Sequence, residues 1–189
     1  MRRKLKVLFI STIIIISIIG IIVVAEKILE KNNTGIKEII DNIAQKEETT
    51  TEDPFLLSDE VIKNYLTPNE YSRPGKELKE VNALVVHYVG NPGTTAAQNR
   101  SYFENLKDTH ATSASSHYII GMEGEIIQCV PLNEISYASN NRNKDTIAIE
   151  CCHPDETGQF TTATYKSLVK LVAALCRTYD LDPETGIIR

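Results

Sequence analysis

The stretch VNALVVHYVGNPGTTAAQNR, residues 81–100, decides how the rest of this chain is interpreted. Its first half is a run of apolar, largely β-branched residues that ends at His87 and Tyr88, and such a run predicts a buried strand. The residues GNPG at positions 90–93 then interrupt the strand. His87 therefore stands where a strand ends and the backbone opens, which is a usual place for a functional side chain on a rigid support. A core histidine that hydrogen-bonds a neighbouring backbone group is an equally good interpretation at this point.

The segments that follow predict the α/β class, with a mixed central β-sheet flanked by helices. In chain order, the elements expected after the first strand are a helix at 94–108, strands at 117–121, 125–130 and 145–152, and a helix at 161–181. The first two of these strands form a hairpin with its turn around Glu123 and Gly124. The last helix shows one apolar face at helical spacing, which consists of Tyr165, Leu168, Val169, Val172, Leu175 and Cys176.

The amino-terminal part predicts a membrane anchor. Residues 7–25, VLFISTIIIISIIGIIVVA, contain no charged side chain, and a helix of that length nearly spans a hydrocarbon core of about 30 Å. The preceding basic residues 1–6, MRRKLK, are expected to stay in the cytoplasm. The sequence thus predicts one uncleaved transmembrane helix in the cell membrane, a polar linker or stalk at 26–60, and a domain at 61–189 on the cell-wall side. A cleaved signal peptide is the alternative, although its apolar core is usually only about 7–15 residues long.

Charge and cysteine content argue against three classes of protein: nucleic-acid binders, small disulfide scaffolds and C-x-x-C zinc proteins. The net charge of −5 gives no sign of a nucleic-acid partner. The four cysteines, Cys129, Cys151, Cys152 and Cys176, show neither the paired spacing of a small disulfide scaffold nor a C-x-x-C zinc pattern. We therefore expect free thiols that pack as small apolar groups.

A second candidate functional residue is Glu150, in the strand sequence TIAIECC at 146–152. A carboxylate inside an otherwise apolar strand is costly to bury unless it has a partner or a task. One interpretation is a salt bridge to an arginine such as Arg100 or Arg142. The other is a general base near a metal, with a pKa raised by its apolar surroundings. In that case His87 and Glu150 meet at one site.

Three ordered blocks of the chain, at residues 82–106, 115–139 and 141–176, resemble consecutive blocks of the zinc-dependent N-acetylmuramoyl-L-alanine amidases. They read NALVVHYVGNPGTTAAQNRSYFENL, SSHYIIGMEGEIIQCVPLNEISYAS and NRNKDTIAIECCHPDETGQFTTATYKSLVKLVAALC. This type 2 amidase family is related to peptidoglycan-recognition proteins and phage T7 lysozyme. The resemblance covers about residues 66–189 and implies a mixed sheet flanked by helices. It also implies hydrolysis of the amide between N-acetylmuramic acid and L-alanine in peptidoglycan.

The resemblance also implies roles for individual residues. His87 matches the first zinc ligand of the family, and Glu150 matches the acidic residue that activates water. Tyr137 falls where the family often places an aromatic residue that lines the substrate groove. Ser116 stands where the family often has a tyrosine, so that role is not transferred. In such a site, zinc polarises the amide and the glutamate moves a proton from the water to the leaving amine.

The chain departs from the family pattern in its metal ligands. The family takes its second and third ligands, a histidine and then a cysteine or aspartate, from a segment that follows a motif like IIR. This chain has the matching motif GIIR at residues 186–189. Two of the three expected zinc ligands are absent from the chain, as in a fragment or a truncated relative. We do not expect the other histidines to replace them: His110 is expected to be exposed, His117 structural or groove-lining, and His153 part of a turn.

Three functions remain open from the sequence. The leading one is a membrane-anchored hydrolase of peptidoglycan in the cell wall. The alternative is a non-catalytic module that binds muropeptides and lacks a complete zinc site. The third is a non-enzymatic membrane anchor with a degenerate domain, which the intact apolar face of the 161–181 helix argues against.

Overall fold

The computed structural model describes residues 53–189. The predicted cytoplasmic segment at 1–6, the predicted transmembrane helix at 7–25 and most of the predicted linker lie outside this part of the chain. Within the described part, no helix combines the length and the apolar character that crossing a membrane requires.

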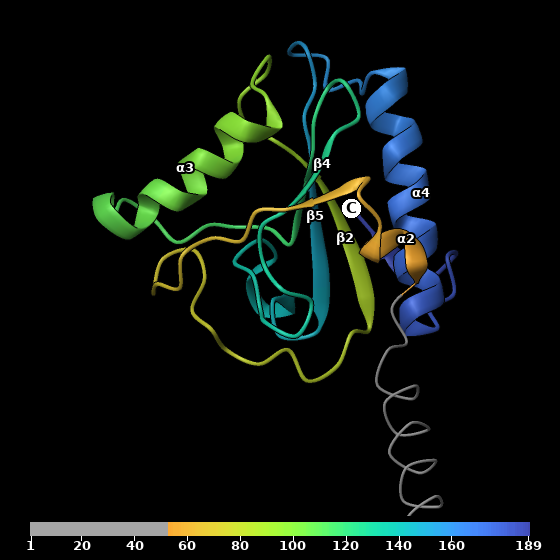
Figure 1. The fold of residues 1–189 in the computed structure, drawn as a ribbon, viewed down its shortest axis with the longest axis horizontal. Helices are drawn as coiled ribbons and strands as arrows, with labels where there is room; N and C mark the ends of the chain where they lie inside the picture. The colour runs from red at the N-terminus through yellow and green to blue at the C-terminus, as the bar shows by residue number, and fades with distance from the viewer. Residues whose placement is uncertain (1–52) are drawn as a thin grey trace, which may run out of the picture. The chain divides into compact units, whose positions relative to one another are not determined.

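A six-stranded mixed sheet forms the centre of the described part, with the strand order β1-β4-β3-β5-β2-β6 (Figure 1). The strands are β1 (Val61–Lys63), β2 (Ala83–Tyr88), β3 (Tyr118–Ile120), β4 (Ile126–Gln128), β5 (Thr146–Cys151) and β6 (Ile187–Ile188). All neighbouring pairs are parallel except β3 and β4, which form the predicted antiparallel hairpin. The mixed sheet flanked by helices is therefore confirmed.

The helices lie on both sides of the sheet. They are α2 (Pro54–Leu57), α3 (Ala96–Thr109), the 3₁₀ helix η1 (Asn140–Arg142) and α4 (Thr162–Tyr179). Helix α3 begins at a capping box, in which the Thr95 side chain accepts from the Gln98 backbone and the Gln98 side chain accepts from the Thr95 backbone. Figure 1 shows α3 and α4 on opposite sides of the strands.

Two apolar clusters fill the layers between the sheet and the helices. Alternate residues of a strand point to opposite faces, and β5 illustrates this because Ile149 packs in the cluster with α4 while Cys152, just past the strand, packs in the cluster with α3. All four cysteines are buried free thiols, as expected. The first three residues of β2 and the first four of β5 are buried, and the two strands become more exposed toward His87 and Glu150.

The apolar face predicted for the last helix is only partly buried. Leu168, Leu175 and Cys176 are buried, but Tyr165 is 60% exposed and Val169 is 50% exposed. The sheet covers only the middle of the apolar stripe, which runs through Leu168, Leu171 and Leu175. Tyr165 and Val169 lie on the flank of that stripe.

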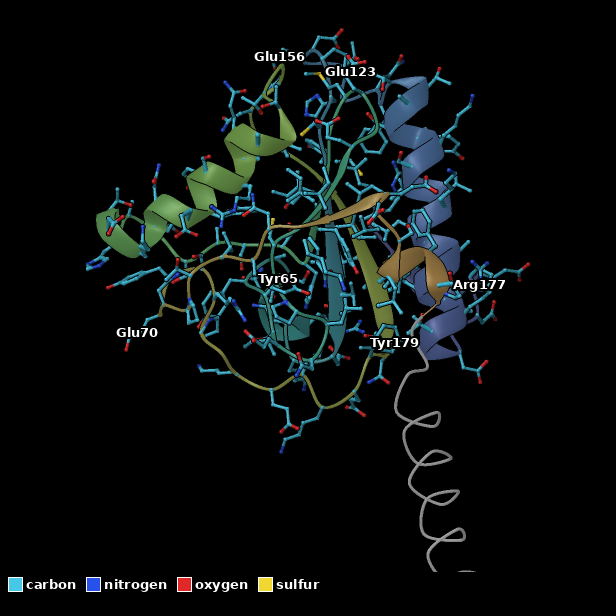
Figure 2. The ribbon with its side chains drawn as sticks, in the orientation of Figure 1. Tyr65, Glu70, Glu123, Glu156, Arg177 and Tyr179 are labelled. Atoms are coloured by element: carbon cyan, nitrogen blue, oxygen red, sulfur yellow. The ribbon has the colours of Figure 1, made fainter. Side chains whose placement is uncertain are left out.

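The packed part of the chain also starts before the predicted linker boundary at residue 60. Leu56 of α2 is buried in the cluster with α4, and the Asp53 backbone N–H donates to Thr178 Oγ1 at 2.9 Å. Asp53 also pairs with Arg177, which lies on the last turn of α4 (Figure 2), at 2.6 Å. These contacts fasten the start of the described chain to the carboxyl-terminal end of α4.

Candidate active site

His87 and Glu150 lie side by side, as the sequence suggested. Strands β2 and β5 are parallel neighbours, and His87 is the residue directly opposite Glu150 in their register. Directly paired residues of two strands point their side chains to the same face of the sheet. On its other side, Glu150 pairs in register with Ile119 of β3, so an apolar residue flanks the carboxyl group there.

Within residues 53–189, no charged side chain pairs with the Glu150 carboxyl group. Its Oε2 atom is buried and makes no hydrogen bond within the described chain. The alternative salt bridges are wrong, because Arg142 pairs with Asp145 at 2.9 Å and Arg100 pairs with Glu104 at 3.1 Å. Burial raises the pKa of Glu150 to about 7, since desolvation disfavours the charged form.

That pKa suits proton transfer. A group with a pKa near the working pH is present in both protonation states, and it can accept and return a proton at little cost. Perturbed carboxyl groups of this kind gather at functional sites.

The His87 imidazole is half-buried, and burial lowers its pKa. Its Nε2 atom lies 3.2 Å from Ser139 Oγ. Ser139 is fixed in turn, because its backbone N–H and that of Ala138 both donate to Asn143 Oδ1, at 2.6 and 3.1 Å. Neither Ser139 nor Asn143 was identified from the sequence; the polar run SNNRN at 139–143 predicts a turn but not its contact with His87.

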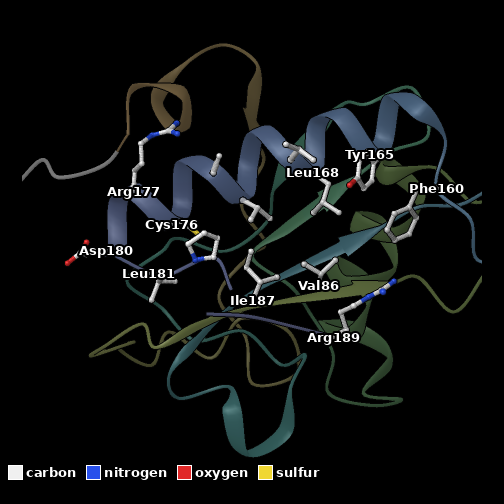
Figure 3. A pocket seen from close by; sticks show the side chains of 14 residues that line it. Val86, Phe160, Tyr165, Leu168, Cys176, Arg177, Asp180, Leu181, Ile187 and Arg189 are labelled. Atoms are coloured by element: carbon white, nitrogen blue, oxygen red, sulfur yellow. The ribbon is translucent and has the colours of Figure 1, made fainter. Parts of the chain in front are cut away.

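A cavity of about 630 Å³ opens beside His87. Its lining residues are Val86, His87, Tyr88, Gly90, Phe160 and Arg189. It lies on the outer side of β2, where β6 pairs only with Leu84 and Val85. A second hollow of about 820 Å³ follows α4 and shares Val86, Phe160 and Arg189 with the first (Figure 3).

Tyr137 is not among the residues that line the cavity beside His87. Its backbone pairs with Ser115, because Ser115 N–H donates to Tyr137 O at 3.1 Å and Tyr137 N–H donates to Ser115 Oγ at 3.0 Å. The tyrosine is half-buried and stands two residues before Ser139, the contact of His87.

His117 has a structural role. It is completely buried, and its Nε2 lies 2.9 Å from the Glu134 carbonyl oxygen. Its Nδ1 accepts from the Ala148 backbone N–H at 3.0 Å and lies 3.0 Å from Ser136 Oγ. The pattern requires a neutral ring with its proton on Nε2, and burial accordingly lowers the pKa of His117 to about 4.

The two remaining histidines also bind local groups. His153 is buried at the exit of β5, and its ring nitrogens lie 2.7 Å from the Asp155 carbonyl oxygen and 2.8 Å from that of Val89. His110 is exposed and stacks on Tyr71 with ring centroids 4.3 Å apart. Both agree with the turn and surface positions expected for them.

The donor set does not fit a closed zinc site. Within residues 53–189, no group of three or more His, Cys, Asp or Glu side chains is arranged to hold a metal ion. A zinc site of the family type needs three protein ligands, and His87 is the one that stands at a matched position. Burial raises the pKa of Cys129 and Cys151 to about 12, which disfavours the thiolate that binds metals.

Comparison with known proteins supplies the identification. The family model for N-acetylmuramoyl-L-alanine amidase matches residues 77–189. The chain belongs to this amidase family. The amidase CwlL of Bacillus licheniformis is 31% identical over 134 residues, which are 64% of this chain and 37% of CwlL. The amidase BlyA of Bacillus subtilis (strain 168) is 31% identical over 146 residues, 67% of this chain and 38% of BlyA. The chain thus spans less than two fifths of these relatives.

Solved structures show that the amidase fold is present. The catalytic domain of XlyA superposes with a TM-score of 0.56 at 22% identity, covering 68% of this chain and 82% of that one. The amidase LysC from Clostridium intestinale URNW gives 0.55 at 16% identity, covering 70% and 83%. Drosophila peptidoglycan recognition protein SD gives 0.55 at 11% identity, covering 68% and 82%. The family and its fold, expected from the three sequence blocks, are therefore confirmed.

Proposed function

We propose that this chain acts on peptidoglycan and hydrolyses the amide between N-acetylmuramic acid and L-alanine, with Glu150 as the general base. The observation that carries the proposal is the Glu150 carboxyl group, which has a pKa of about 7 and a buried Oε2 atom without a hydrogen-bond partner in the described chain, directly opposite His87 in a domain of the amidase family. The activity named for the relatives CwlL and BlyA supports the same reaction.

The step assigned to Glu150 is a proton transfer in both directions. The ionised carboxylate takes a proton from water, and the water oxygen attacks the amide carbonyl carbon. The protonated carboxyl group then returns the proton to the amine of L-alanine as the carbon–nitrogen bond breaks. Because no cation neutralises Glu150 in the described chain, the carboxylate keeps its basicity.

We also propose His87 as a ligand of the zinc ion that the family uses. The described residues do not supply the other two ligands, so amine release by this chain would show that zinc acts here without them or with ligands from outside residues 53–189. The contact with Ser139 Oγ orients the His87 ring by its Nε2 atom. We propose Tyr137 as a substrate contact, because its loop carries Ser139.

The proposed setting is the cell membrane. Residues 7–25 would anchor the chain by a single span, and the amidase domain would face the cell wall, where its substrate lies. This part of the proposal rests on the uncharged run at 7–25 and the basic residues before it.

The incomplete ligand set favours a second candidate function, a module that binds muropeptides without cleaving them. Incubation of the full chain with purified peptidoglycan separates the two functions. New amino groups are titrated in the supernatant while the bound protein is measured by sedimentation. We expect amine release by the unmodified chain with zinc in the buffer, and release lost but binding kept after Glu150→Gln. Binding without release by the unmodified chain would support the second function, and unchanged release by the variant would remove the role of Glu150.

A further inference from the structure

Tyr88 is a large aromatic residue that stands exposed next to His87. Its side chain is 65% exposed, and it lines the cavity of about 630 Å³ together with His87 and Gly90. A cavity of this size falls within the usual range of small-ligand sites, about 300–1,000 Å³. The chemistry assigned to Glu150 and His87 does not use this ring.

The Tyr88 ring is held in place from one side. It meets the His153 ring edge to face, with centroids 5.5 Å apart and an interplanar angle of 79°. His153 is itself 2% exposed, and its ring nitrogens lie 2.7 and 2.8 Å from the carbonyl oxygens of Asp155 and Val89. The strand also fixes the backbone, because Tyr88 pairs with Cys151 in the β2–β5 register.

An aromatic ring that is rigid before binding loses little freedom when a ligand covers it. A scattered surface tyrosine is ordinary, but this one combines a ring contact with the buried His153 and a place in the cavity beside His87. The free part of the ring therefore offers a preformed flat surface to a ligand.

We propose that Tyr88 is a stacking platform for the sugar ring of N-acetylmuramic acid. The inference rests on the proposed function, since it concerns the sugar side of the amide that the water activated by Glu150 attacks. The negative face of an aromatic ring attracts groups of partial positive charge, and a pyranose ring presents a flat row of such C–H groups, whereas the stem peptide has no comparable flat apolar face.

The position of Tyr88 agrees with a substrate whose amide lies at His87 and whose sugar lies at Tyr88. His87 and Tyr88 are consecutive residues at the end of β2, so their side chains leave on opposite faces of the sheet. Both residues nevertheless line the cavity of about 630 Å³. A substrate in this cavity can place its amide toward His87 and its sugar toward Tyr88.

Binding of two probes to the full chain tests the inference. N-acetylmuramoyl-L-alanyl-D-isoglutamine carries the sugar, and L-alanyl-D-isoglutamine lacks it. Both are titrated by NMR into the chain with Glu150→Gln, which prevents turnover, and into the same chain with Tyr88→Ala, Tyr88→Phe or Tyr102→Ala. Tyr102 is a matched control, because it is 48% exposed and lies on α3, outside the cavity lining.

We expect Tyr88→Ala to weaken binding of the sugar-bearing probe about tenfold, which is ~1.4 kcal/mol, and to leave the sugar-free probe within about twofold. Tyr88→Phe and Tyr102→Ala should bind both probes as the parent does. Equal losses for both probes, or no loss for either, would overturn the platform while the proposed function stands. If the parent binds neither probe, the proposed function fails and the platform with it. Thermal unfolding of each variant checks that the Ala variant is folded.

Discussion

The raised pKa of Glu150 makes a prediction about stability that needs no substrate. In the folded chain burial raises this pKa to about 7 from the ordinary value of 4.5. Between these two values the unfolded chain is ionised while the folded chain holds the proton. The folded state therefore loses stability as the pH rises through this window, because ionisation is easier in the unfolded chain.

The change Glu150→Gln removes the titration and keeps the shape of the side chain. Each unit of pKa shift corresponds to about 1.4 kcal/mol, so a shift from 4.5 to about 7 destabilises the ionised folded chain by up to about 3 kcal/mol above pH 8. Between pH 5 and pH 8 the advantage of the Gln variant over the unmodified chain should grow by about 2.5 kcal/mol.

Urea denaturation at pH 5, 6.5 and 8 measures this difference. Terms from other titrating groups cancel between the two proteins, because only residue 150 differs. Glu123→Gln is the matched control, since Glu123 is exposed at the hairpin turn (Figure 2) and has no role in the site. A constant offset for Glu150→Gln, or a variant less stable at pH 8, would refute the reasoning about burial.

Three other predictions concern residues of the fold that surrounds the site. Thr95→Ala removes the capping box of α3 and should cost about 1 kcal/mol in urea denaturation, with Thr95→Ser close to the unmodified chain; equal losses for both would contradict the cap. The buried His117 ring, with its pKa of about 4, should show unchanged NMR signals from pH 8 to pH 5.5, and a midpoint near 6.5 would contradict its hydrogen bonds. Gly124→Ala should cost about 1–3 kcal/mol in thermal or urea unfolding, because φ is +89° and a Cβ atom would lie 2.9 Å from Ser167 Oγ; a variant of unchanged stability would show that the turn relaxes freely.

The elements that local periodicity determines were predicted well from the sequence. The strand ending at Tyr88, the hairpin around Gly124 and the helix after Thr95 all depend on residues close in the chain. The pairing of His87 with Glu150 could also be predicted from the sequence, because parallel strands bring their carboxyl ends to one edge of the sheet.

The features that depend on distant neighbours were not predictable. Arginines were available to pair with Glu150, and only the fold shows that Arg142 turns to Asp145 instead. The exposure of Tyr165 and Val169 depends on how far the sheet reaches under α4, which no apolar pattern encodes. The contact of Ser139 with His87 joins a loop to a strand across 52 positions of the chain.

The activity proposed for this chain is the cleavage of one particular amide of peptidoglycan. Mass spectrometry of the fragments released from purified peptidoglycan, in buffer containing zinc, identifies the bond directly. We expect stem peptides with a free amino group on L-alanine and glycan strands that keep the lactyl group of N-acetylmuramic acid. Fragments cut between sugars or between two amino acids of the stem peptide would contradict it, and so would intact peptidoglycan recovered with the chain bound to it.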